Sequence, residues 1–151
     1  MQKIKLDQGD WVVVCDGKKA LILENVGDWK FPNLQTREIF EQKNPPTREQ
    51  GSDAPGRSIQ SVGTARSAME QTDWHRKAEE DFLHGLADKL DAAIESGQTS
   101  SLVMVAPPRA LGIIRNAYSQ HVRHALRGEV DKDFVKMPVH EIEQQLTGGP
   151  R

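Results

Sequence analysis

The chain has 151 residues, of which 36% are hydrophobic and 28% are charged, and this length predicts one domain, residues 1–151, that can bury one core. The formal net charge of -2 at pH 7 excludes the strongly basic surface that is typical of dedicated nucleic-acid-binding proteins. The single cysteine, Cys15, excludes an internal disulfide and a zinc site built from several cysteines.

Three strands are predicted in the first 42 residues. Trp11–Cys15 is a continuous apolar run rich in β-branched residues, which indicates a strand buried on both faces. We therefore expect Cys15 to be a core thiol that packs as a small hydrophobe. The Asp-Gly pair that follows is a strong hairpin signal and precedes a return strand over residues 18–26. A third strand is predicted over residues 34–42, where the apolar alternation is imperfect.

The chain changes character over residues 43–73. Six residues in this stretch disfavour regular structure: Pro45, Pro46, Gly51, Pro55, Gly56 and Gly63. We therefore expect a long irregular loop over about residues 43–73. Loops of this length are uncommon in compact domains, and where they occur they are usually functional or disordered.

The second half of the chain predicts alternating helices and strands. Asp73 is a good N-cap for a helix from Trp74 to about Gly97, in which apolar residues at helical spacing form one stripe and acidic residues mostly face away from it. A central parallel strand, a helix, a strand and a short last helix are then predicted over residues 101–106, 108–121, 125–130 and 139–146, before a frayed tail at 147–151. The fold class is α/β, a mixed sheet flanked by helices in the order β-β-β-long loop-α-β-α-β-α.

Five short motifs occur in order along the chain. They are Trp11–Ala20, Gly56–Arg66, Asp73–Arg76 before the helix bearing Phe82, Ala106–Arg115 and Asp131–Pro138. Together they resemble the bacterial host-attachment protein family, whose members are described as required for attachment to host cells. The resemblance covers nearly the whole chain, from about Trp11 to Leu146. It implies a phenotype and no particular chemistry.

That family is in turn similar to the middle domain of archaeal and eukaryotic class-1 translation release factors. In those domains a hairpin precedes an exposed loop bearing Gly-Gly-Gln, and a long helix follows the loop. The resemblance implies a layered, RNase H-like architecture and a loop presented to an RNA-rich partner such as the ribosome. Here the loop reads Gly56–Ser61 without Gly-Gly-Gln, and Gln60 stands near the comparable position. Peptide release is therefore not expected.

The loop at residues 56–66 carries the main candidate binding residues. Arg57 and Arg66 could bind phosphate groups because the guanidinium fork matches two phosphate oxygens. Ser58 adds a hydrogen-bond donor, and Gln60 adds an amide. The alternative is a solvated loop whose charges have no function.

Outside the loop, His75 lies four residues before Glu79, so both can face the same side of a helix. It is a candidate for binding or acid–base chemistry, and the alternative is a histidine that pairs with an acidic residue of the next turn. A metal would need a third ligand, and none is identifiable. We therefore expect no metal and no other cofactor.

Arg109 follows the carboxyl end of the predicted strand at 101–106, where ligands of open α/β sheets commonly bind. At a helix start it is a candidate anion site, and the alternative is a rigid turn with an exposed arginine. His121 and His124 flank a predicted helix end, where the macrodipole favours a charged histidine.

These observations favour a non-catalytic binding module that engages RNA, the ribosome or a protein partner through the 56–66 loop and affects host attachment indirectly. One alternative is a hydrolase acting on an ester or phosphoester through Gln60 and His75, and another is an oligomeric regulatory or structural protein. The N-terminal residues lack the apolar stretch of a signal peptide, and no run approaches the ~18–20 apolar residues of a membrane span. A cytoplasmic location is therefore expected.

Overall fold

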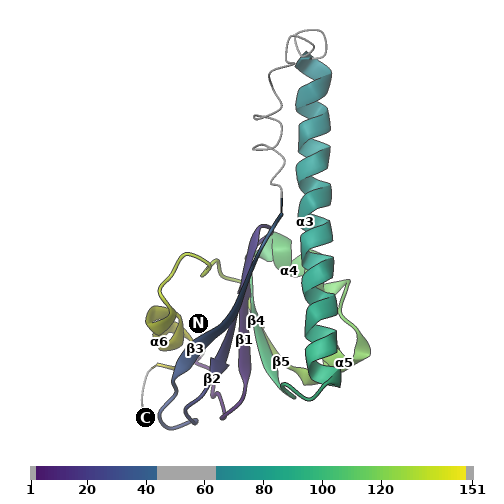
Figure 1. The fold of residues 1–151 in the computed structure, drawn as a ribbon. Coiled ribbons are helices and arrows are strands. Elements are labelled where there is room, and N and C mark those ends of the chain that lie inside the picture. The colour runs from purple at the N-terminus through teal and green to yellow at the C-terminus, as the bar shows by residue number, and fades with distance from the viewer. Residues whose placement is uncertain (1–2, 44–63, 149–151) are drawn as a thin grey trace.

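The computed structural model describes residues 3–43 and 64–148, with side chains in the second range from residue 73 onward. These residues form a five-stranded mixed sheet in the order β3-β2-β1-β4-β5, with helices on both faces (Figure 1). The predicted α/β class and the mixed sheet are confirmed.

The three N-terminal strands form an antiparallel meander. They are β1 (Trp11–Cys15), β2 (Lys19–Asn25) and β3 (Leu34–Glu41), each close to its predicted position. The hairpin turn between β1 and β2 is held by Asp16, whose Oδ1 accepts hydrogen bonds from the backbone N–H groups of Lys18 and Lys19, both at 2.8 Å. A short polar side chain can stabilise a turn in this way.

The second half of the chain adds two parallel strands. β4 (Leu102–Val105) pairs in parallel with β1 and with β5 (Leu126–Val130), so the predicted central parallel strand is confirmed. All residues of β1 and β4 are buried. Both strands lie inside the sheet with covered faces, which explains their continuous apolar runs.

Helices cover the two faces of the sheet unequally. α3 (Thr64–Glu95), α4 (Pro108–Arg115) and α5 (Gln120–Ala125) pack on one face, and α6 (Val139–Thr147) packs on the other. Figure 1 shows α3 running along the sheet and continuing well past its edge.

The prediction of an irregular loop up to residue 73 is wrong at its C-terminal end, because α3 begins at Thr64. Asp73 is therefore inside the helix and is not its N-cap. From Thr64 onward the sequence has no proline or glycine before Gly85 and is rich in alanine, arginine, methionine, glutamate and glutamine. These residues favour helix, and extending a formed helix is easier than nucleating one. Residues 44–63 of the predicted loop lie outside the described residues.

The predicted single helix over residues 108–121 is also wrong, because two helices occupy this region. α4 ends at Arg115, and α5 begins after Ser119, whose Oγ accepts a hydrogen bond from the backbone N–H of Val122 at 3.1 Å. This N-cap starts a new helix. Thr147, predicted to begin a frayed tail, is the last residue of α6, and its hydroxyl donates to the Glu143 carbonyl at 2.8 Å.

Candidate functional site

The structure describes only part of the predicted binding loop. Arg57, Ser58 and Gln60 lie outside the described residues. Arg66 is in the first turn of α3, so the predicted 56–66 loop ends in a helix. The motif at these residues therefore leads directly into α3.

Helix α3 has two parts with different surroundings. The first buried side chain described in it is Leu83, and five side chains from there onward are buried against the sheet: Leu83, Leu86, Ala87, Leu90 and Ala93. We call residues 64–80 the projecting segment and residues 83–95 the packed segment. At about 1.5 Å per residue, the projecting segment is roughly 25 Å long.

Two aromatic side chains of the projecting segment have described positions. Trp74 keeps 44% of its surface exposed, although indole rings are usually well buried. His75, one of the predicted candidates, is half-buried on the same helical turn. Tryptophan is enriched among the residues that dominate binding at protein interfaces, so this exposed ring marks the projecting segment as a candidate contact surface.

The other predicted candidate outside the loop, Arg109, lies where the projecting segment meets the body. Its Nε and Nη2 both donate to Oε1 of Glu79, at 3.1 and 3.0 Å. Glu79 is one helical turn after His75, and its side chain lies over Gly17, where an added Cβ would stand 2.7 Å from Cγ of Glu79. The structure therefore brings Arg109 and Glu79 together at the turn between β1 and β2, and an anion at Arg109 would compete with the Glu79 carboxylate.

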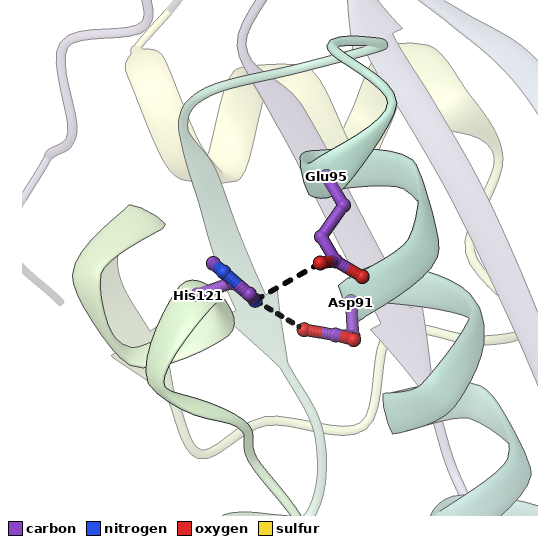
Figure 2. A group of neighbouring side chains, drawn as sticks. All are labelled: Asp91, Glu95 and His121. Atoms are coloured by element: carbon purple, nitrogen blue, oxygen red, sulfur yellow. Dashed lines mark hydrogen bonds and ion pairs between the residues drawn. The ribbon is translucent and has the colours of Figure 1, made fainter.

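A second group of side chains, which the sequence did not predict as a site, joins the end of α3 to the start of α5. Nδ1 of His121 lies 2.9 Å from Oδ1 of Asp91 and 3.9 Å from Oε1 of Glu95 (Figure 2). The Ser119 hydroxyl donates to the same Asp91 oxygen at 2.5 Å. The hydrogen bond from Ser119, followed by that from His121, lowers the pKa of the Asp91 carboxyl below its ordinary value.

A surface hollow of about 490 Å³ lies beside this group. His121 and His124 of α5 line it together with Ile94 of α3, and Asp10 and Thr99 line it from the chain segments that precede β1 and β4. Asp10 is ion-paired with Arg127 at the start of β5. His124 lies in the last turn of α5, as the macrodipole interpretation expects, but His121 lies in the first turn.

Only part of this group was predictable from the sequence. Asp91 and Glu95 are four residues apart on one helix, so their proximity was predictable. Their contact with His121 depends on the break between α4 and α5, which is not apparent in the sequence pattern.

No helix in the described ranges is long and apolar enough to cross a membrane. No functionally curated protein matches the sequence. Residues 11–146 match the family described as "Protein required for attachment to host cells", and this range is most of the chain and includes every described strand and helix except the last residue of α6. The chain belongs to this family, which suggests a role in host attachment.

Proposed function

We propose that the protein is a non-catalytic binding protein, that the projecting segment of α3 docks on a protein partner in the cytoplasm, and that this interaction affects host attachment indirectly. The observation that carries the proposal is the division of α3. The helix has 32 residues, but the first of its described side chains to be buried is Leu83. Packing on the sheet therefore accounts for only the second part of the helix.

The chemistry of the projecting segment favours a protein partner. Trp74 offers a large, half-exposed aromatic surface, and tryptophan is among the residues that contribute most to protein–protein binding. A projecting helix can be bound in an apolar groove of a partner.

RNA or the ribosome is the alternative partner, and it rests on the likeness to the middle domain of class-1 release factors, where a long helix also follows the functional loop. In the second half of the projecting segment, the positive charges of Arg76 and Lys77 are balanced by three acidic residues, Asp73, Glu79 and Glu80. Affinity for nucleic acid depends mainly on cationic groups that contact phosphates. The mixed charge of this region therefore supports RNA less than it supports a protein.

The test compares two tryptophans with equal exposure. Trp29, in the turn between β2 and β3, is also 44% exposed, so Trp29→Ala is a matched control for Trp74→Ala. Each variant and the wild-type chain would be cross-linked in the native cell through Lys77, whose side chain is 71% exposed, and the adducts identified by mass spectrometry.

We expect a protein adduct at Lys77 that is lost in Trp74→Ala and retained in Trp29→Ala, with host attachment reduced in the same variant only. Adducts that disappear after ribonuclease treatment would favour the RNA alternative. If Trp74→Ala leaves the adducts and attachment unchanged, the projecting segment is not the binding part of the protein.

A further inference from the structure

The group at the end of α3 has the composition of a metal site. Asp91 and Glu95 of α3 and His121 of α5 each offer one ligand atom, and all three atoms lie within 4.8 Å of one another. They come from two helices that are separate in the sequence, so the fold brings them together. One imidazole with two carboxylates is a ligand set found in divalent transition-metal sites.

The distances from the His121 ring nitrogen to the two carboxylates suit a shared ion. Two ligands bound about 2.1 Å from an ion at tetrahedral or octahedral angles stand roughly 3.0–3.4 Å apart. The measured separations from Nδ1 of His121 are 2.9 Å to Asp91 and 3.9 Å to Glu95, which bracket this range. Figure 2 shows both carboxylates turned toward the same edge of the imidazole ring. An ion can therefore enter with small side-chain rotations, replacing the proton shared by His121 and Asp91.

The electrostatics of this corner favour a cation. Glu95 is the last residue of α3, and the last turn of the helix contains no basic residue. Glu95 therefore stands at the negative end of the helix macrodipole, where anionic side chains are unfavourable, and Asp91 lies one turn before it. Among the described side chains, His121 is the only ion-pair partner of either carboxylate, and it is positive only when protonated.

The surroundings complete the site. Ser119 donates to Asp91 and so fixes the orientation of one ligand, as outer-sphere hydrogen bonds do in metal sites. The hollow beside His121 opens to solvent and also contains His124. Water or a group of a partner can fill the remaining coordination positions from this side.

We propose that Asp91, Glu95 and His121 bind a divalent transition-metal ion such as Zn²⁺, which fastens α5 to the end of α3. The site lies in the packed segment, away from Trp74, so it is independent of the proposed docking function. Zn²⁺ is the first probe because imidazole and carboxylate both suit it.

The experiment is isothermal titration calorimetry of the untagged, chelator-treated chain with Zn²⁺ at pH 7.5. Glu95→Gln keeps the size of an exposed side chain, and His121→Ala removes the nitrogen ligand. His84→Ala is the matched control, because His84 is an exposed histidine on α3 one turn before Asp88 and has no described third ligand.

We expect saturable binding of one Zn²⁺ per chain, with a dissociation constant raised at least tenfold by Glu95→Gln and by His121→Ala and changed less than twofold by His84→Ala. Bound Zn²⁺ should also raise the Tm of the wild type and of His84→Ala, but not of His121→Ala, because a ligand that binds only the folded state stabilises it. Absence of saturable binding, an equal loss in His84→Ala, or equal affinity for Mg²⁺ would each overturn the proposal.

Discussion

The two segments of α3 differ in what surrounds them, although they belong to one continuous helix. In the packed segment, Leu83, Leu86 and Leu90 are almost fully buried against the sheet. In the projecting segment, Trp74 is half-exposed, and Arg76 and Lys77 are exposed. One part is held by apolar burial and the other extends from it.

This difference separates stability from recognition. Isolated helices in water are marginal, and tertiary packing provides most of the stability of helices in proteins. The packed segment therefore holds the projecting segment in place, while side chains such as Trp74 remain available for a partner. Substitutions in the two segments should have different consequences. Three measurements, from the largest expected effect to the smallest, test this difference and the packing on which it depends.

The largest effect is expected for Leu90→Ala in the packed segment. Leu90 is fully buried, and truncating such a side chain removes apolar burial and leaves a cavity, which costs about 2–5 kcal/mol. The free energy of unfolding from urea denaturation would measure this loss. Trp74→Ala is the contrasting variant, and we expect it to change the free energy of unfolding by less than about 0.5 kcal/mol, as exposed substitutions usually do. Equal losses in the two variants would contradict the division of α3.

An intermediate effect on the free energy of unfolding is expected from ionisation of the Cys15 thiol at high pH. Cys15 lies on the sheet face that the packed segment covers. Burial, and then the nearby charge of Asp16, raises the pKa of the Cys15 thiol from 9.0 to about 12. Between these pH values the unfolded chain loses a proton that the folded chain keeps. The free energy of unfolding should therefore fall as pH rises above 9, by up to about 1.4 kcal/mol per pH unit.

Urea denaturation at pH 8 and pH 10.5 would measure this fall, with Cys15→Ala as the control. Burial also raises the pKa of Tyr118, so some loss at high pH remains in the control. The part due to Cys15 is the difference between the wild type and Cys15→Ala in how far the free energy of unfolding falls between the two pH values. If Cys15→Ala loses stability as steeply as the wild type, water reaches this face of the sheet.

The strands could be predicted because their signals are local. β1 and β4 are short apolar runs that contain β-branched residues, as is typical of strands covered on both faces, and the Asp-Gly pair marks the turn between β1 and β2. Each was correctly placed from the residues alone. The last helix was also predicted to within one residue, since Pro138 precedes its first residue, Val139.

The start of α3 and the α3–α5 contact were not predictable in the same way. Helix formers after Gly63 carry no distinctive start signal, and Asp73 was a more attractive N-cap than the observed start at Thr64. The group around His121 depends on a chain reversal between two short helices and on the position of α3 beside them. Such contacts between distant residues are fixed by packing, and helical periodicity does not report them.

The smallest effect is expected at the boundary between the segments, where Arg109 pairs with Glu79. Arg109 is 64% exposed, so solvent screens the pair, and Arg109→Ala should cost less than about 1 kcal/mol. A double-mutant cycle with Glu79→Gln would isolate the interaction. The matched control is Lys77 with Asp81, a pair that is farther apart at 3.6 Å and more exposed.

We expect the coupling energy of Glu79 with Arg109 to exceed that of Lys77 with Asp81, because two nitrogens of Arg109 converge on one oxygen of a partly buried carboxylate. Gly17→Ala is a second test of the interaction between Glu79 and Arg109, since the added methyl group displaces Glu79 from its position over the turn. It should therefore reduce the coupling of Glu79 with Arg109 and leave that of Lys77 with Asp81 unchanged. If the two pairs couple equally, Glu79 does not tie α3 to the body, and the projecting segment extends as far as Leu83.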